Sequence, residues 1–146
     1  MSDFNFHTTL KVRFDETDML GHVSFSHYYS YFDVGLTEYL EAIGCGYAQL
    51  RGEGIELVYV ESHCNNQSGA LWPELLQVWT RVGNVGRTSL RFEFEVIAAA
   101  DSRKVATGHI VAVVTGADLS GGIPIPKVLR RAITAFEGEA LPETLA

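Results

Sequence analysis

The feature that most constrains the fold is a single apolar stripe along one long predicted helix. Across residues 28–43 apolar residues recur at helical spacing, and polar residues fill the opposite side. Ser24 or Ser26 can cap the start of this helix, and Gly44 is well placed to end it. The stripe consists of Tyr28, Tyr31, Phe32, Gly35, Leu36, Tyr39, Leu40 and Ile43. A helix with so continuous an apolar face needs a large apolar partner.

Most of the remaining chain has the alternation of β-strands and can supply that partner. Strands are predicted at residues 8–14, 55–63, 74–82, 87–99 and 104–115. Gly83 to Gly86 and residues 100–102 read as turns. The last strand is apolar on both faces, which predicts an interior place in its sheet. A short helix follows, with Pro126 at its start and Gly138 at its end.

The order of these elements predicts the fold class. One strand, one long helix and then about four strands joined mostly by short turns argue for an α+β fold with an antiparallel sheet. The simplest architecture wraps this sheet around the long helix. A chain of 146 residues is long enough for one compact core, so we expect residues 1–146 to form a single domain.

Composition excludes several classes of function. The chain has 11 basic and 18 acidic residues, a formal charge of −7, which disfavours a general nucleic-acid binder. Cys45 and Cys64 form no CxxC pair, and the first residues lack a secretory signal pattern. No apolar run approaches the roughly 20 residues that span a bilayer. We therefore expect a cytoplasmic protein that binds neither membrane nor nucleic acid.

The loop before the long helix, within the stretch RFDETDMLGHVSFSHYYSYFD of residues 13–33, carries more chemistry than a turn needs. Gly21 suits a turn, but a turn does not also require Asp18 and His22. A helix N-terminus offers unpaired N–H groups and a positive dipole end to a developing oxyanion. Asp18 just ahead of it can act as a general base on water or as a nucleophile. From the loop alone, a turn or capping role for Asp18 is favoured.

A resemblance over nearly the whole chain reverses that preference. The segments TDMLGHV (17–23) and YYSYF (28–32) resemble the hotdog-fold acyl-CoA thioesterases of the 4-hydroxybenzoyl-CoA thioesterase family. VGNVGRTSLRFEFEV and GGIPIPKVLRRAI resemble that family's penultimate hairpin and closing helix, so the similarity extends from about residue 10 to about residue 136. Two departures stand out: residues 33–36 lack the family's Glu-Arg-Ala-Arg-like charges, and Ser24-Phe25 replaces Asn-Asn.

The resemblance implies a curved antiparallel sheet of about five strands around one central helix. It implies a homodimer whose sheets join edge to edge, with the acyl-CoA between the subunits, and it leaves open a pairing of dimers into tetramers. Asp18 would supply the catalytic carboxylate, and the backbone amides that follow it would polarise the thioester carbonyl. The implied reaction converts an acyl-CoA to a carboxylic acid and free coenzyme A. No cofactor is expected, because coenzyme A is part of the substrate.

Several further residues are candidates for the site, and each also has a purely structural interpretation. His22 either positions water or the carbonyl, or packs at the helix start. The candidates for contact with the acyl group or coenzyme A are Gly21, Val23, Tyr28, Val60, His63 and Arg87. Alternatives to Arg87 for the phosphates are Arg91, Arg130 and Arg131, although such residues usually form a solvated face.

Other readings of the chain remain. His22 and His27 with Glu16 or Asp18 match no recognised metal-ligand spacing, so no metal is expected. An acyl carrier protein thioesterase or a dehydratase would keep the fold; the former needs a basic patch and the latter acid–base residues inside the helix. A non-catalytic acyl-CoA-binding protein is a third class. Asp18 discriminates against it, because simple binding has no use for a carboxylate at the carbonyl.

Overall fold

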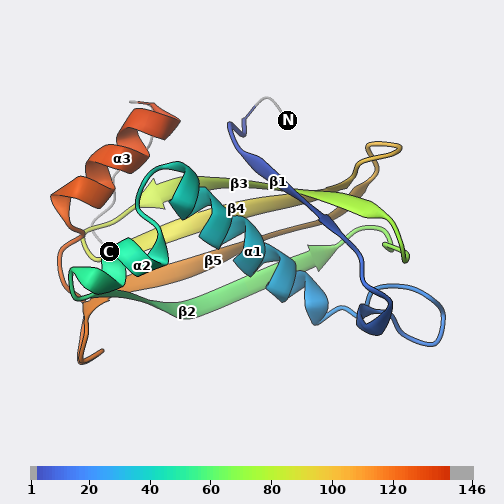
Figure 1. Ribbon diagram of the computed structural model, residues 1–146, viewed down its shortest axis with the longest axis horizontal. Coiled ribbons are helices and arrows are strands. Elements are labelled where there is room, and N and C mark those ends of the chain that lie inside the picture. Colours follow the sequence, from blue (N-terminus) through green and yellow to red (C-terminus); the bar gives the residue numbers. More distant parts are fainter. Residues whose placement is uncertain (1–2, 139–146) are drawn as a thin grey trace.

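A computed structural model describes residues 3–138 of the chain (Figure 1). Before the long helix lie β1 (His7–Lys11) and a 3₁₀ turn (Phe14–Glu16). The helices are α1 (His27–Ala42), α2 (Tyr47–Gly52) and α3 (Lys127–Glu137). The other strands are β2 (Ile55–Asn66), β3 (Leu75–Val85), β4 (Ser89–Ala98) and β5 (Lys104–Gly116).

The five strands form one antiparallel sheet in the order β1-β3-β4-β5-β2. The α+β prediction is therefore confirmed, and so is the interior place of the strand rich in apolar residues, since β5 lies between β4 and β2. β2 and β1 are the edges. β2 is 12 residues long and β1 only five, so the two edges differ greatly in length.

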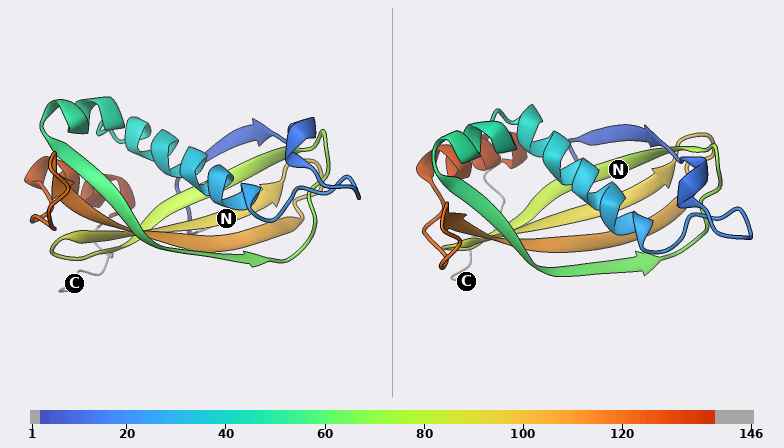
Figure 2. Two further views of the ribbon diagram at one scale, coloured as in Figure 1. Left: turned by 90° about the horizontal axis from the view of Figure 1, so that it is seen from below. Right: turned by 60° about the horizontal axis from the view of Figure 1, so that its bottom comes forward.

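The helix α1 lies across the concave face of the curved sheet (Figure 2). The predicted stripe is buried against the sheet except for Ile43, which is half-buried just after the helix, and Phe32 stacks on Phe94 of β4 with ring centroids 4.7 Å apart. Gly35 permits a close approach to β3, because a Cβ there would lie 2.5 Å from Thr80 Oγ1. Burial of these large side chains is the main stabilising term. None of the helices within residues 3–138 has the length and apolarity to cross a membrane.

Two local predictions are wrong, and one short helix was not predicted. The first strand ends at Lys11, and Phe14 belongs to a 3₁₀ turn that redirects the chain toward α1. The turn predicted from Gly83 begins later, since β3 continues to Val85 through a bulge between Val82 and Asn84. The short helix α2 has a single buried residue, too few for a recognisable helical period.

Candidate active site

The loop between β1 and α1 is held closed by its own backbone. An isolated bridge pairs Thr17 with Val23, and the N–H of Asp18 donates to the carbonyl of His22 at 2.8 Å. Gly21 has a φ of +80°, the left-handed conformation that glycine adopts without strain. The predicted role of Gly21 in a tight loop therefore has a structural basis, and the loop displays Asp18 at an exposed position.

The two carboxylate oxygens of Asp18 have different surroundings. Oδ1 accepts the backbone N–H of Leu20 at 2.9 Å and that of His22 at 3.2 Å. Oδ2 has no hydrogen-bond partner among residues 3–138. The turn role and a chemical role are thus compatible in one side chain: one oxygen fixes the loop, and the other remains available to a ligand or water.

The start of α1 lies directly after this loop. The N-cap residue Ser26 makes no side-chain cap, and the N–H groups of His27, Tyr28 and Tyr29 donate to carbonyls three residues earlier. In the described part of the chain, the N–H groups of Phe25 and Ser26 have no acceptor. Unpaired amides at a helix N-terminus attract negative charge.

A second segment, residues 69–71, braces the same loop. His22 forms a bridge with Leu71, and the N–H of Val23 donates to the carbonyl of Ala70 at 2.8 Å. The imidazole of His22 lies over Gly69, where a Cβ would come within 2.5 Å of Cδ2. His22 is therefore an exposed residue of the loop that carries Asp18, with its ring against Gly69.

Arg103 holds the bracing segment in place. Its Nη2 donates to the carbonyl of Gly69 at 3.0 Å and to the carboxylate of Glu74 at 2.9 and 3.0 Å. Glu74 also contacts the bracing segment directly, since its Oε1 accepts the N–H of Leu71 at 2.7 Å. No local sequence pattern predicts this support, because Arg103 and Gly69 are 34 residues apart.

Exposed apolar side chains surround the Asp18 loop. Phe14 contacts Trp72 edge-on, with ring centroids 5.5 Å apart. The exposed set at this end of the molecule is Phe14, Met19, Leu20, Phe25, Leu71 and Trp72. An acidic group among several large exposed apolar side chains is more typical of a binding site than of a plain solvated loop.

The structure brings together only part of the predicted site. Asp18, Gly21, His22 and Val23 share one loop, with Val23 buried beneath it. Tyr28 lies in the core in the first turn of α1, where burial raises the pKa of its hydroxyl. It packs edge-on against the Tyr31 ring at 5.7 Å.

The other three predicted residues lie away from the loop within one chain. Val60 is 58% exposed at a bulge in the edge strand β2. His63 pairs with His109 of β5 on the face of the sheet opposite α1, and the two rings stack at 5.4 Å. Arg87 is exposed at the turn between β3 and β4, where its carbonyl accepts the N–H of Ile125.

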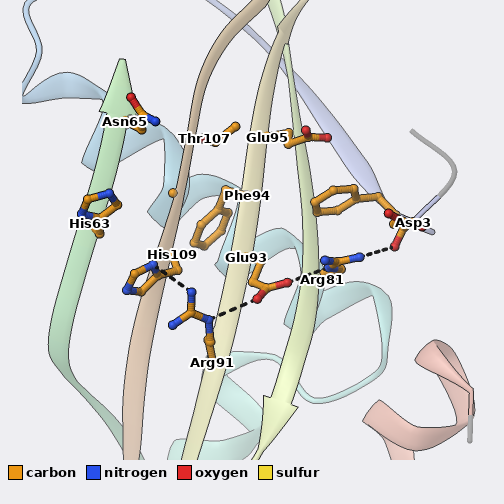
Figure 3. Close-up of a pocket in the computed structure, with 12 residues that line it drawn as sticks. Asp3, His63, Asn65, Arg81, Arg91, Glu93, Phe94, Glu95, Thr107 and His109 are labelled. Carbon is orange, nitrogen blue, oxygen red and sulfur yellow. Dashed lines mark hydrogen bonds and ion pairs between the residues drawn. The ribbon is translucent and has the colours of Figure 1, made fainter. Parts of the chain in front are cut away.

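That opposite face carries a cavity of about 440 Å³, crossed by a chain of polar contacts (Figure 3). Glu61 Oε2 lies 2.6 Å from His109 Nε2, and His109 Nδ1 lies 3.2 Å from Arg91 Nη2. Arginine can only donate, so Nδ1 is the acceptor and the proton of neutral His109 is on Nε2. Glu93 then accepts from Arg91 at 3.1 Å and from Arg81 at 2.8 Å.

These contacts favour the structural reading of Arg91. Its guanidinium is committed to Glu93 and His109, so it is not free for a phosphate. Sequence reasoning missed His109 and Arg81 as members of this network, because only the strand register shows that they face it. No cluster of three or more His, Cys, Asp or Glu side chains within residues 3–138 is arranged to hold a metal ion.

Comparison with known proteins fits this geometry. A sequence profile of the Thioesterase-like superfamily matches residues 12–133. The chain is 27% identical over 111 residues to a protein of Aquifex aeolicus named "Putative esterase", covering 70% of this chain and 87% of that protein.

Solved structures agree with the fold. A DHNA-CoA thioesterase from Staphylococcus aureus superposes with a TM-score of 0.83 at 20% identity, covering 96% of this chain and 97% of that one. A hypothetical protein from Thermus thermophilus superposes with a TM-score of 0.82 at 25% identity, covering 89% and 98%. The architecture expected from the sequence, a curved sheet around one central helix, is the hotdog fold of these neighbours.

Proposed function

Because the chain belongs to the Thioesterase-like superfamily, we propose that it is an acyl-CoA thioesterase in which Asp18 drives hydrolysis. One observation carries the proposal. The uncommitted Oδ2 of Asp18 belongs to the loop that leads directly into the unpaired N–H groups of Phe25 and Ser26. A carboxylate and oxyanion donors beside each other are what thioester hydrolysis needs.

Asp18 and the backbone amides of Phe25 and Ser26 have separate roles in the proposed reaction. The thioester oxygen accepts hydrogen bonds from the N–H groups of Phe25 and Ser26, which become stronger as negative charge develops on it. Asp18 takes a proton from the water that attacks the carbonyl carbon; the carbon–sulfur bond then breaks, and this proton passes to the departing sulfur, so that coenzyme A leaves as a thiol and Asp18 is again a carboxylate. In the alternative route Asp18 attacks directly, and water then hydrolyses the mixed anhydride. Both routes yield one carboxylic acid and one coenzyme A per water consumed.

A second copy of the chain completes the site in this proposal. Asp18 lies on an open surface of the single chain, and β2 is a long sheet edge with Tyr59 and Val60 exposed. A long unpaired edge favours pairing with another strand. Pairing of two β2 edges would continue the sheet into a homodimer and bring the partner's copy of this strand toward the acyl group. Val60 and His63 belong to the site through this pairing.

Coenzyme A requires local positive charge on an acidic protein. Arg87 is exposed, and its guanidinium has no ion pair within residues 3–138, so it can meet a phosphate. We place the reaction in the cytoplasm, where coenzyme A thioesters are made and where the free thiols of Cys45 and Cys64 would stay reduced.

The test is a thiol-release assay with short-chain, long-chain and aromatic acyl-CoAs. We expect at least one class to be hydrolysed with kcat/KM in the enzymatic range of about 10⁴ M⁻¹s⁻¹ or more. The Arg87→Ala variant should raise KM for that substrate and leave kcat nearly unchanged. Saturable acyl-CoA binding without thiol release from any class would replace this proposal with a non-catalytic binding protein.

A further inference from the structure

Glu16 joins three segments around the Asp18 loop although it stands outside the proposed chemistry. Its side chain is only 12% exposed, which is unusual for a carboxylate on a short turn. It lies two residues before Asp18 and one residue before the bridge between Thr17 and Val23. Any movement of Glu16 therefore moves the base of the loop.

The contacts of Glu16 reach in three directions. Oε1 accepts the backbone N–H of Arg13 at 2.8 Å, where the chain leaves β1. The same oxygen accepts the hydroxyl of Tyr31 at 2.9 Å, from the second turn of α1. The carbonyl of Glu16 accepts the N–H of Ser24 at 3.0 Å, just before the unpaired amides. Buried carboxylates need such partners, and hydrogen bonds to a charged acceptor are the stronger ones.

Tyr31 is a rigid anchor for this carboxylate. Its side chain is 2% exposed in the core beneath α1 and packs edge-on against Tyr28. Burial, followed by the hydrogen bond to Glu16, raises the pKa of the Tyr31 hydroxyl, so it remains a donor at any working pH. The bond thus connects the loop to a helix that cannot shift without disturbing the core.

We propose that Glu16 and Tyr31 form a positioning pair that holds the Asp18 carboxylate in register with the N–H groups of Phe25 and Ser26. Neither residue touches the substrate in this role. The inference rests on the proposed hydrolysis for its kinetic consequence. Its geometric consequence, a fixed Asp18 loop, is independent of any activity.

The chain contains a matched control for the key variant. Tyr39 is also a buried tyrosine of α1, and its hydroxyl donates to the Glu137 carboxylate at 2.5 Å. It lies eight residues further along the helix and contacts no part of the Asp18 loop. Tyr31→Phe and Tyr39→Phe therefore delete the same atom from the same helix, at a similar expected cost of about 1 kcal/mol in unfolding free energy.

The kinetic experiment compares these two variants on the best acyl-CoA. Because a misplacement of about 1 Å can cost up to about 10²-fold in rate, we expect Tyr31→Phe to lower kcat about tenfold with KM within twofold of wild type. Tyr39→Phe should leave kcat within twofold. Equal kcat values for the two variants would overturn the proposal.

A second pair of variants separates the effect of the hydrogen-bond acceptor at position 16 from the effect of its charge. Glu16→Gln keeps an oxygen for Arg13 and Tyr31, so it should retain kcat within about threefold, whereas Glu16→Ala should lose at least as much as Tyr31→Phe. A Glu16→Gln variant as slow as Glu16→Ala would contradict positioning by this acceptor.

Hydrogen exchange supplies a readout that needs no activity. The N–H groups of Leu20 and His22, which donate to Asp18 Oδ1, should exchange faster in Tyr31→Phe and at the wild-type rate in Tyr39→Phe. Unchanged exchange in Tyr31→Phe would overturn the positioning pair even if the protein hydrolyses thioesters. Absence of thiol release from the wild-type protein, with faster exchange in Tyr31→Phe, would overturn only the hydrolytic function.

Discussion

The two ends of α1 share one kind of hydrogen bond but differ in what surrounds it. Each end has a buried tyrosine that donates to a carboxylate, Tyr31 to Glu16 and Tyr39 to Glu137. At the C-terminal end, three aromatic rings meet the Tyr39 ring edge-on: Phe6 just before β1, Phe92 of β4 and Phe136 of α3. At the N-terminal end, the carboxylate instead supports an exposed loop.

The two ends also differ in whether their hydrogen-bonding groups have partners. Glu137 accepts from Tyr39 and from the N–H of Val82, so the C-terminal end of α1 is tied to β3 and α3. At the N-terminal end, two amides and one oxygen of Asp18 have no hydrogen-bond partner within residues 3–138. The closed end fixes the helix against the sheet, and the open end leaves its positive pole exposed.

The largest effect is expected at the open end, from Asp18→Asn. Asparagine keeps an oxygen for the N–H groups of Leu20 and His22 but cannot take a proton, so kcat should fall about 10²–10⁴-fold while the fold persists. The measurement is steady-state thiol release with circular dichroism on the same samples. Asp15→Asn removes the same charge from an exposed neighbour and should keep kcat within twofold. Full turnover by Asp18→Asn would contradict a catalytic role for Asp18 and, with it, the functional distinction between the two ends of α1.

An intermediate effect is expected midway between the ends, from Gly35→Ala. The added Cβ would meet Thr80 Oγ1 at 2.5 Å and Val78 Cγ1 at 2.7 Å, so the helix must move away from β3. Overpacking of this kind costs about 1–3 kcal/mol, partly offset by up to about 1 kcal/mol of better helix propensity. Denaturant unfolding measures the loss. Gly52→Ala in α2, where nothing lies within 4 Å, should not destabilise, and equal stability of the two variants would refute a tight contact at Gly35.

The smallest effect is expected at the closed end, in alkaline solution. Burial and the bond to Glu137 raise the pKa of Tyr39 above its ordinary value of 10.0. The unfolded chain therefore ionises Tyr39 first, so its contribution to stability is complete below pH 10 and is lost as the pH rises further. In Tyr39→Phe, the fall in unfolding free energy between pH 10 and 11 should be smaller by about 1 kcal/mol, because Tyr39 is only half ionised in the unfolded chain at pH 10. Identical slopes in urea titrations would contradict the raised pKa.

The sequence predicted the helix and the inner strands well, because their signals are periodic and local. The stripe from residue 28 to residue 43 became α1, and the alternation in residues 87–99 became β4 with its apolar face beneath the helix. Gly83 misled the turn prediction for a physical reason. It makes room for a side chain of the neighbouring strand, since a Cβ there would lie 2.4 Å from Glu93 Cδ.

Only the residues of the candidate site that lie within one loop were predictable from the sequence. Asp18, Gly21 and His22 stand together in the sequence and remain together in the fold. The partners that hold them are distant in sequence, 15 residues from Glu16 to Tyr31 and 34 from Gly69 to Arg103. Such pairings depend on how the loop packs on α1 and on the register of the sheet, which no local pattern encodes.

The most direct test of the account follows the amides of both helix ends by ¹H–¹⁵N NMR. The added ligand is an analogue of the fastest acyl-CoA substrate in which a methylene group replaces the thioester sulfur, so that its carbonyl binds without hydrolysis. We predict that the Phe25 and Ser26 signals shift on saturation, while those of Ile43 and Gly44, which already donate within the chain, stay in place. Saturable binding that leaves Phe25 and Ser26 unmoved would contradict a catalytic site at the head of α1.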